Sequence, residues 1–394
     1  MLFSRERHCD LGFPEWNTTT AYIFIEQLFQ TIEQRFNPIN GWSTATGALK
    51  YSLYGGDAGT CWSQTYLAKF GYGTENSQYN GFLDMALPQH TQALTQEFTS
   101  AQYQQGLLIG KLGLLVAQNA DKSTAKLTQS IITSISELTN NTVCEYMWGS
   151  PGALAFAAFN KATTASYIPL IKDIISSLET QLIDSTSLGV KVWQQNLYSQ
   201  KICHLGAVHG FAGNAFSIIK SLAIVDDKSA NNWKSIIINT IKQTVIHDGS
   251  RANWPQSIDG NRFGRDELLV QFCHGAPGII CCVIDLFGID NEFDQLMIGG
   301  AELAWQAGPP KKGVNLCHGI AGTGYCFLKL FKATGDEKWL MRARMFASLA
   351  IYQAQQSQLS GQYNLSLWNG DSGLAHFIHQ CINATSDIPT MDYF

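Results

Sequence analysis

The chain has 394 residues, of which 45% are hydrophobic and 14% are charged, and its formal net charge is −5. With so few charges, many helix surfaces must face other helices or a lined cavity rather than water. The net charge is negative, and Lys and Arg residues form no cluster beyond short pairs. Both observations argue against a nucleic-acid-binding protein.

The N-terminal stretch and the most apolar run predict neither a secretory signal nor a membrane span. Residues 1–16 contain no apolar core behind their charges. The run 271–289 is interrupted by His274, Pro277 and Asp285. Ten cysteines are too few for a disulfide scaffold in a chain of this length. We therefore expect reduced thiols in the cytoplasm, where clustered Cys and His residues indicate a metal or catalytic site.

A Gly-x-x-Gly step followed by an apolar run recurs seven times along the chain. Successive copies are separated by 39 to 65 residues, enough for two helices and their connections. A single copy would indicate only a turn, but seven copies indicate a repeated unit. The first glycines of the copies are Gly56, Gly110, Gly149, Gly210, Gly275, Gly319 and Gly370.

Each repeat predicts a buried inner helix and a second, outer helix. The segments after the glycines, such as "ALAFAAFNKA", are apolar all round and therefore predict buried helices. The stretch 336–352 begins at a good N-cap, Asp336, and carries apolar residues at helical spacing. Strand signals are scarce. The pattern predicts an all-α assembly, and closure into a ring would gather the glycine turns at one end.

Convergence of the turns would bring together Cys273, His274, Cys317, His318 and His209 from three copies. Two thiolates and one imidazole, from Cys273, Cys317 and His318, match a zinc ion with an open fourth position. Two buried structural Cys-His pairs are the alternative. A zinc hydrolase would need a carboxylate base, and no Asp or Glu lies within five residues of either cysteine.

Several motifs resemble the lanthionine synthetase C-like (LanC-like) family: "CHGAPG", "LCHGIAGTGY", "LGAVHGFAGNAF" and "LSLWNGDSGLAHFI". The segments "WQAGPPKKGVNLCHGIAG" and "GNRFGRDELLVQFCHGAPG" are most similar to its eukaryotic-type branch. The resemblance extends from about residue 50 to residue 394 and implies an α/α toroid of seven inner and seven outer helices. We expect one LanC-like barrel domain over residues 1–394, with residues 1–45 as an N-terminal extension packing on it.

By this resemblance, Cys273, Cys317 and His318 are the ligands of one zinc ion, and the reaction adds a thiol to a dehydroalanine or dehydrobutyrine residue of a peptide or protein. Glutathione is the thiol in the eukaryotic-type branch, whereas the bacterial cyclases use a peptide cysteine and form a lanthionine. A non-catalytic, zinc-containing scaffold that binds glutathione or a peptide is a further alternative. We expect a monomer.

Conjugate addition also needs an acid–base group and a donor that stabilises the enolate. His209 matches a family motif histidine and is our candidate for the acid–base group, although a histidine at a helix start is often structural. His274 is either a proton donor or a supporting residue. Lys312 matches a lysine of the eukaryotic-type branch that binds glutathione or enolate charge, unless it simply forms a solvated pair with Lys311.

The arginine candidates for the site depart from the family pattern in their spacing. Cyclases carry an arginine shortly before the first zinc cysteine, and the nearest here is Arg265, with Arg262 close by. The spacing is one residue longer than the family pattern, so either arginine could instead pair with Asp266. Four further residues are weaker candidates for the site: Asp57, Glu145, His376 and His379. For the two histidines we favour a role in core packing.

Overall fold

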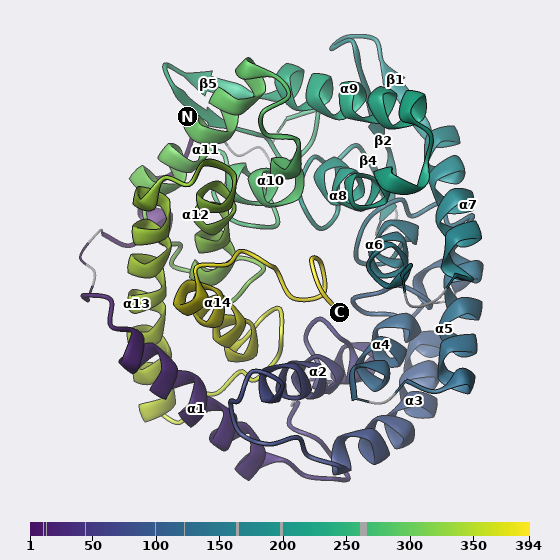
Figure 1. Cartoon of the computed structure of the whole chain (residues 1–394), viewed down its shortest axis with the longest axis vertical. Coiled ribbons are helices and arrows are strands. Elements are labelled where there is room, and N and C mark those ends of the chain that lie inside the picture. The colour runs from purple at the N-terminus through teal and green to yellow at the C-terminus, as the bar shows by residue number, and fades with distance from the viewer. Residues whose placement is uncertain are drawn as a thin grey trace.

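Fourteen α-helices form two concentric rings in the computed structural model of the chain (Figure 1). The structure describes residues 1–10, 12, 14–43, 45–98, 100–121, 123–162, 165–197, 200–260 and 266–394. The inner helices are α2 (Asp57–Ala68), α4 (Lys111–Asp121), α6 (Ser150–Asn160), α8 (Phe211–Ser221), α10 (Ala276–Val283), α12 (Ile320–Thr334) and α14 (Asp371–Asn383). The outer helices are α1 (Thr18–Arg35), α3 (Gln78–Glu97), α5 (Ala125–Leu138), α7 (Tyr167–Thr180), α9 (Asp227–Thr244), α11 (Asn291–Ala307) and α13 (Glu337–Leu359). The predicted toroid is confirmed.

The two rings differ in burial as their sequences predict. Inner helix α6 is buried at every residue from Ser150 to Ala158. Outer helix α13 begins after Asp336, whose side chain accepts a hydrogen bond from the Lys338 amide at 3.0 Å. It continues beyond the predicted end at residue 352. Residues 1–45 supply outer helix α1, which packs against α14 and α13.

Short elements fill the connections between the helices. Three antiparallel hairpins pair β1 (Leu182–Ser185) with β2 (Val190–Trp193), β3 (Gln195–Leu197) with β4 (Gln200–Ile202), and β5 (Ile246–Asp248) with β6 (Arg251–Asn253). In register, Leu182 lies opposite Trp193, Gln195 opposite Ile202, and Ile246 opposite Asn253. The 3-10 helices are η1 (Arg5–Arg7), η2 (Gly47–Tyr51), η3 (Ala101–Tyr103), η4 (Leu222–Ile224) and η6 (Ile284–Leu286).

The repeated glycines mark the points where neighbouring units touch. In every copy the first glycine immediately precedes an inner helix. The second glycine lies against the carbonyl oxygen of the residue six positions earlier, where a Cβ would overlap it. It also faces a side chain of the preceding unit, as Gly322 faces Phe272. Gly59 of the first unit faces Leu367 of the seventh in the same way. The contact between units is therefore repeated where the two ends of the chain meet.

Backbone hydrogen bonds also link the turns around the ring. From the fifth unit through the seventh and on to the third, the residue two positions before the first glycine donates to its equivalent in the next unit. The bonds run from Cys273 to Cys317, Cys317 to Trp368, Trp368 to Tyr54, Tyr54 to Leu108 and Leu108 to Met147, at 2.8–3.1 Å. Between the third and fourth units the Tyr146 amide donates to the Val208 carbonyl at 3.0 Å instead. These bonds hold the turns that carry the two cysteines in fixed order with their neighbours.

Both ends of the chain pack against this ring. The Met1 carbonyl accepts from the Leu268 amide at 3.2 Å, and the Cys9 amide donates to the Pro309 carbonyl at 2.8 Å. Residues 1–10 thus contact the segments that lead to Cys273 and Cys317. Residues 385–394 lie inside the ring (Figure 1), where the Tyr146 hydroxyl donates to the Thr390 carbonyl at 2.9 Å.

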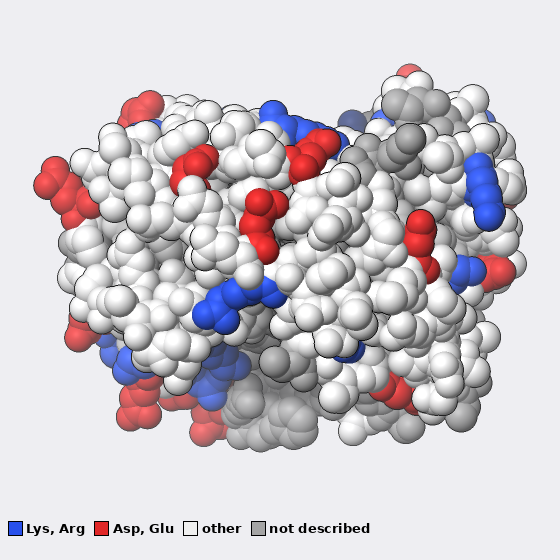
Figure 2. Space-filling model, turned by 90° about the horizontal axis from the view of Figure 1, so that it is seen from below, with Lys and Arg blue, Asp and Glu red and all other residues white. Residues whose placement is uncertain are grey.

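Charged side chains are sparse on the surface. Figure 2 shows acidic and basic residues interspersed over a face that is mostly uncharged. Within the described residues, no helix combines the length and the apolar character that crossing a membrane requires.

Candidate metal centre

Cys273 and Cys317 occupy equivalent positions, two residues before the first glycine, on the turns of the fifth and sixth units. The backbone bond between them, from the Cys273 amide to the Cys317 carbonyl, is 3.1 Å long. Their thiols and a ring nitrogen of His318 all lie within 4.8 Å of one another. Both cysteines are buried, whereas His318 is partly exposed. The fold therefore brings together the three side chains that the sequence predicts as metal ligands.

Hydrogen bonds fix these side chains from behind. The side-chain amide of Gln271 donates a hydrogen bond to Cys273 Sγ at 2.9 Å. The Asn315 side chain accepts from the His318 amide at 2.9 Å, and its own amide donates to the Lys312 carbonyl at 3.0 Å. Gln271 and Asn315 each precede their first glycine by four residues. Each ligand turn is thus braced by a polar side chain at the same position.

The two thiols behave as a coupled pair. Burial alone would raise the pKa of the Cys273 thiol, but a hydrogen bond from Cys317 and the charges of His274 and His318 lower it well below its usual value. That hydrogen bond and burial raise the pKa of the Cys317 thiol. A cation is the natural counter-charge for such a pair. Two thiolates and one imidazole are a donor set that zinc takes, with one position left open.

Tyr54 and Asn369 extend this cluster toward the first and seventh units. Burial and the charges of Cys317 and Cys273 raise the pKa of the Tyr54 hydroxyl, and the Asn369 side chain acts in the opposite direction. The Tyr54 ring stacks on Trp368, with centroids 6.3 Å apart. Tyr54 was not predicted from the sequence, although it occupies the same position on its turn as the two cysteines do on theirs. Alignment of the seven copies could have identified it.

His209 and Glu145 form a second cluster on the third and fourth units. The distance from His209 Nδ1 to Glu145 Oε2 is 2.8 Å. The Glu145 side chain is fully buried, and that of His209 is 23% exposed. The Glu145 carboxylate also accepts the amides of Met147 and Trp148. Glu145 therefore caps its own turn and fixes the ring of His209.

His209, His274 and His318 each directly precede the first glycine of their turn. They therefore occupy equivalent positions on three consecutive units, and Asn369 occupies this position on the seventh. The His274 ring lies 6.0 Å from that of His204. This repeated position places the candidate acid–base group, the candidate ligand and His274 on the same face of the ring.

Of the remaining basic candidates, the structure describes Lys312 but neither arginine. Lys312 is exposed, and its charge acts to lower the pKa of Cys317. It forms no ion pair with any described residue. Arg262 and Arg265 lie outside the described residues.

The weaker candidates lie away from the cysteines. His376 is buried between Ser63 and Tyr393, at 2.9 and 2.8 Å, and burial lowers its pKa to about 3. His379 contacts the Tyr72 hydroxyl at 3.2 Å. Both histidines therefore belong to the packed interior. Asp57 lines a cavity between the first and seventh units.

Comparison with known proteins gives one family. The family model described as "Lanthionine synthetase C-like protein" matches residues 12–393. "Glutathione S-transferase LANCL1" of Danio rerio is 31% identical over 189 residues, which are 47% of this chain and 43% of that protein. "LanC-like protein GCL1" of Arabidopsis thaliana is 35% identical over 129 residues, 31% of this chain and 29% of that protein. The matches span less than half the length of either relative.

A solved structure named "Nisin cyclase" shares the fold. The TM-score is 0.58 with 16% sequence identity, and the match covers 92% of this chain and 94% of that one. At this identity the likeness concerns the arrangement of the helices.

Proposed function

Because the chain belongs to the lanthionine synthetase C-like family, we propose that it adds a thiol to the double bond of a dehydroamino acid residue and forms a thioether. We propose glutathione as the thiol and a dehydroalanine- or dehydrobutyrine-containing peptide or protein as the acceptor. The observation that carries the proposal is the convergence of Cys273, Cys317 and His318 within 4.8 Å. The name of the Danio rerio relative, glutathione S-transferase, supports glutathione as the thiol substrate.

The proposal assigns Cys273, Cys317 and His318 as ligands of a zinc ion. Such an ion supplies a Lewis-acid centre that binds a thiol sulfur and favours its thiolate form at neutral pH. Gln271 and Asn315 keep two of the three ligands in place, because Gln271 bonds the Cys273 thiol and Asn315 bonds the His318 backbone amide. Buried turns that bond one another around the ring hold the site rigid before substrate arrives.

Proton transfer is assigned to His209. The substrate thiol loses its proton to His209, and the sulfur then attacks the β-carbon of the alkene as the C–S bond forms. The π electrons move through the α-carbon to the carbonyl oxygen, and His209 returns the proton to the α-carbon. Glu145 supports both steps, since it holds His209 Nδ1 at 2.8 Å and stabilises the imidazolium. We assign Lys312, His274 and Arg265 to the binding of negative charge on the substrate.

A dehydroalanine peptide incubated with glutathione and the protein tests the proposal. We expect a product heavier by one glutathione, and about one zinc per chain by elemental analysis. Both should be lost in Cys317→Ala and kept in Cys326→Ala, which removes another buried cysteine of the same unit.

Other outcomes separate the alternatives. Ring formation by a cysteine-containing dehydrated peptide, without addition of glutathione, would identify a lanthionine cyclase. Zinc-containing protein that binds but converts neither substrate would indicate a scaffold. Folded protein that neither contains nor takes up zinc would overturn the metal assignment.

A further inference from the structure

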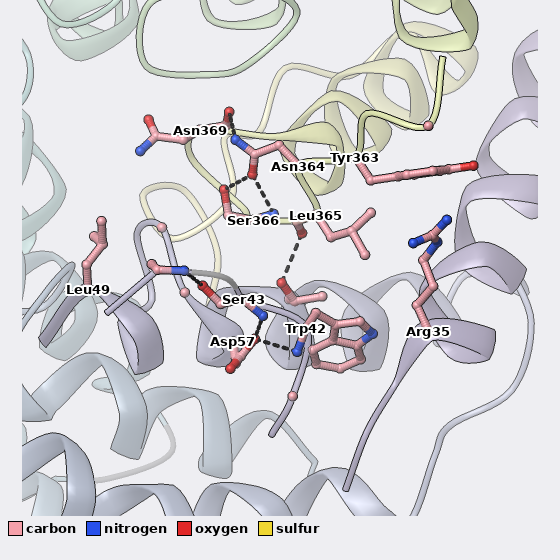
Figure 3. A pocket seen from close by; sticks show the side chains of 16 residues that line it. Arg35, Trp42, Ser43, Leu49, Asp57, Tyr363, Asn364, Leu365, Ser366 and Asn369 are labelled. Carbon is pink, nitrogen blue, oxygen red and sulfur yellow. Dashed lines mark hydrogen bonds between the residues drawn. The ribbon is translucent and has the colours of Figure 1, made fainter. Parts of the chain in front are cut away.

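A cavity of about 700 Å³ lies where the first and seventh units meet (Figure 3). Its walls come from the connection after α1, the turn at Gly55–Asp57 and the segment 361–369. The volume lies within the range of small-molecule sites. Exposed residues, including Arg35, Leu49 and Asn364, line its rim. The cavity is therefore open to solvent.

This cavity shares a wall with the cysteine cluster. Asn369 lines it, and the carbonyl of the preceding residue, Trp368, accepts from the Cys317 amide at 3.1 Å. The segment that lines the cavity thus also contacts the turn of a candidate ligand. A substrate held there would have its neighbouring residue at the site where the sulfur attacks.

Most polar groups of the lining bond one another, so the cavity is already formed. The Trp42 and Ser43 amides donate to Asp57 Oδ1 at 2.9 and 2.7 Å. The Asn364 side chain accepts from Ser366 Oγ at 2.8 Å and donates to the Asn369 carbonyl at 2.9 Å. These bonds are drawn in Figure 3. Recognition of a ligand therefore falls to the groups they leave unused.

Arg35 is the charged group presented to a ligand. Its guanidinium lies over the Tyr363 ring, 3.7 Å from the centroid (Figure 3), and it forms no ion pair with the described residues. A guanidinium stacked on a ring keeps its in-plane N–H groups available for a carboxylate. Asp57, the other charge in the lining, is buried and bonded to backbone amides.

We propose that this cavity binds the part of the acceptor peptide next to the dehydroamino acid, and that Arg35 selects an acidic side chain there. The inference rests on the proposed function. We assign glutathione to Lys312, an exposed lysine on the segment that leads to Cys317 and outside the lining of this cavity. Arg35 and Lys312 would then serve the two substrates separately.

Two dehydroalanine peptides that differ only in a neighbouring Glu or Gln test this assignment. We expect the wild-type protein to bind the Glu peptide roughly tenfold more tightly by fluorescence anisotropy, with a similarly lower KM. Arg35→Gln should remove the difference and leave the KM for glutathione unchanged. Arg251→Gln, at a partly exposed arginine on β6 that pairs with Asp248 outside the cavity, should behave as wild type in this comparison.

Equal binding of the two peptides by the wild-type protein would overturn the proposal. So would an Arg35→Gln effect that falls on glutathione rather than on the peptide. Binding is measured without turnover, so it tests the cavity separately from the proposed reaction. Arg35-dependent peptide binding without thioether product would contradict the proposed reaction and support the peptide site in the cavity. Thioether formation with no dependence on Arg35 would support the reaction and contradict the peptide site.

Discussion

Glu145 is the residue whose charge acts on the candidate acid–base group. Its buried carboxylate holds His209 Nδ1 and two backbone amides. Glu145→Gln keeps the shape of the side chain and one of its two acceptor oxygens, but removes the charge that stabilises the imidazolium. We expect kcat for glutathione addition to fall by roughly 10- to 100-fold, with the zinc content unchanged.

The control for this variant is Glu137→Gln, at an exposed position on α5, which should keep the wild-type kcat. Steady-state kinetics with elemental analysis of both proteins measure the two effects. An unchanged kcat in Glu145→Gln would contradict the role of the Glu145 charge in supporting His209.

Residue identities were predictable where the chemistry is local in sequence. Cys273-His274 and Cys317-His318 are adjacent pairs on repeated turns, so their convergence followed from the repeat. The partnership of Glu145 with His209 spans 64 positions, and Tyr54 meets Cys317 only after the chain has closed. Sequence spacing carries no information on such distant contacts. The roles of these residues therefore became visible only in the folded structure.

At the scale of the helices, the second glycine of each unit decides whether neighbours can touch. A Cβ at Gly322 would overlap the Leu316 carbonyl oxygen and crowd Phe272 of the preceding unit. We expect Gly322→Ala to lower the free energy of unfolding by about 3 kcal/mol or more, because backbone and core must shift. Urea denaturation followed by circular dichroism measures the change.

Gly81 supplies the matched comparison. It also lies in a helix, α3, but a Cβ there would meet no atom within 4 Å. Gly81→Ala should raise stability by about 0.5–1 kcal/mol, because alanine restricts the unfolded chain and favours the helix. Equal effects of the two substitutions would refute the role assigned to Gly322.

The helices were largely predictable, because burial on all sides and a glycine turn before each inner helix are local patterns. The copy at Gly110 and Gly113 would pass for an ordinary turn by itself, yet Gly113 makes the same contacts as the other six second glycines. The hairpins β1–β2, β3–β4 and β5–β6 were not predicted individually. Their strands have only three or four residues, too few to establish an alternating pattern.

For the whole molecule, Asp392 ties the segment 385–394 to the inner ring. Its carboxylate pairs with Lys329 at 2.7 Å and Lys220 at 2.9 Å, and Lys329 is 2% exposed. Burial opposes ionisation of Asp392, but the two lysines lower its pKa from 3.8 to about 2. A lowered carboxyl pKa contributes stability that is present above pH 3.8 and is lost as the pH falls through 2.

We therefore expect Asp392→Asn to lower the free energy of unfolding by about 3 kcal/mol at pH 7, because Lys329 is left buried without its partner. The difference from wild type should shrink as the pH falls from 4 toward 2, where Asp392 itself takes up a proton. Asp387→Asn, which removes an exposed pair with Lys332, should change stability by less than about 0.5 kcal/mol. A difference that persists unchanged at pH 2 would exclude the charge as its cause.

The contact of Leu367 with Gly59 has a consequence for how the chain is made. Translation delivers the first unit well before the seventh, so the apolar side of α2 lacks its neighbour until the seventh unit has left the ribosome. The cavity at that seam forms only then. Contacts this distant in sequence close slowly. A nascent chain stalled before residue 367 should therefore be a substrate for chaperones rather than a partly active enzyme.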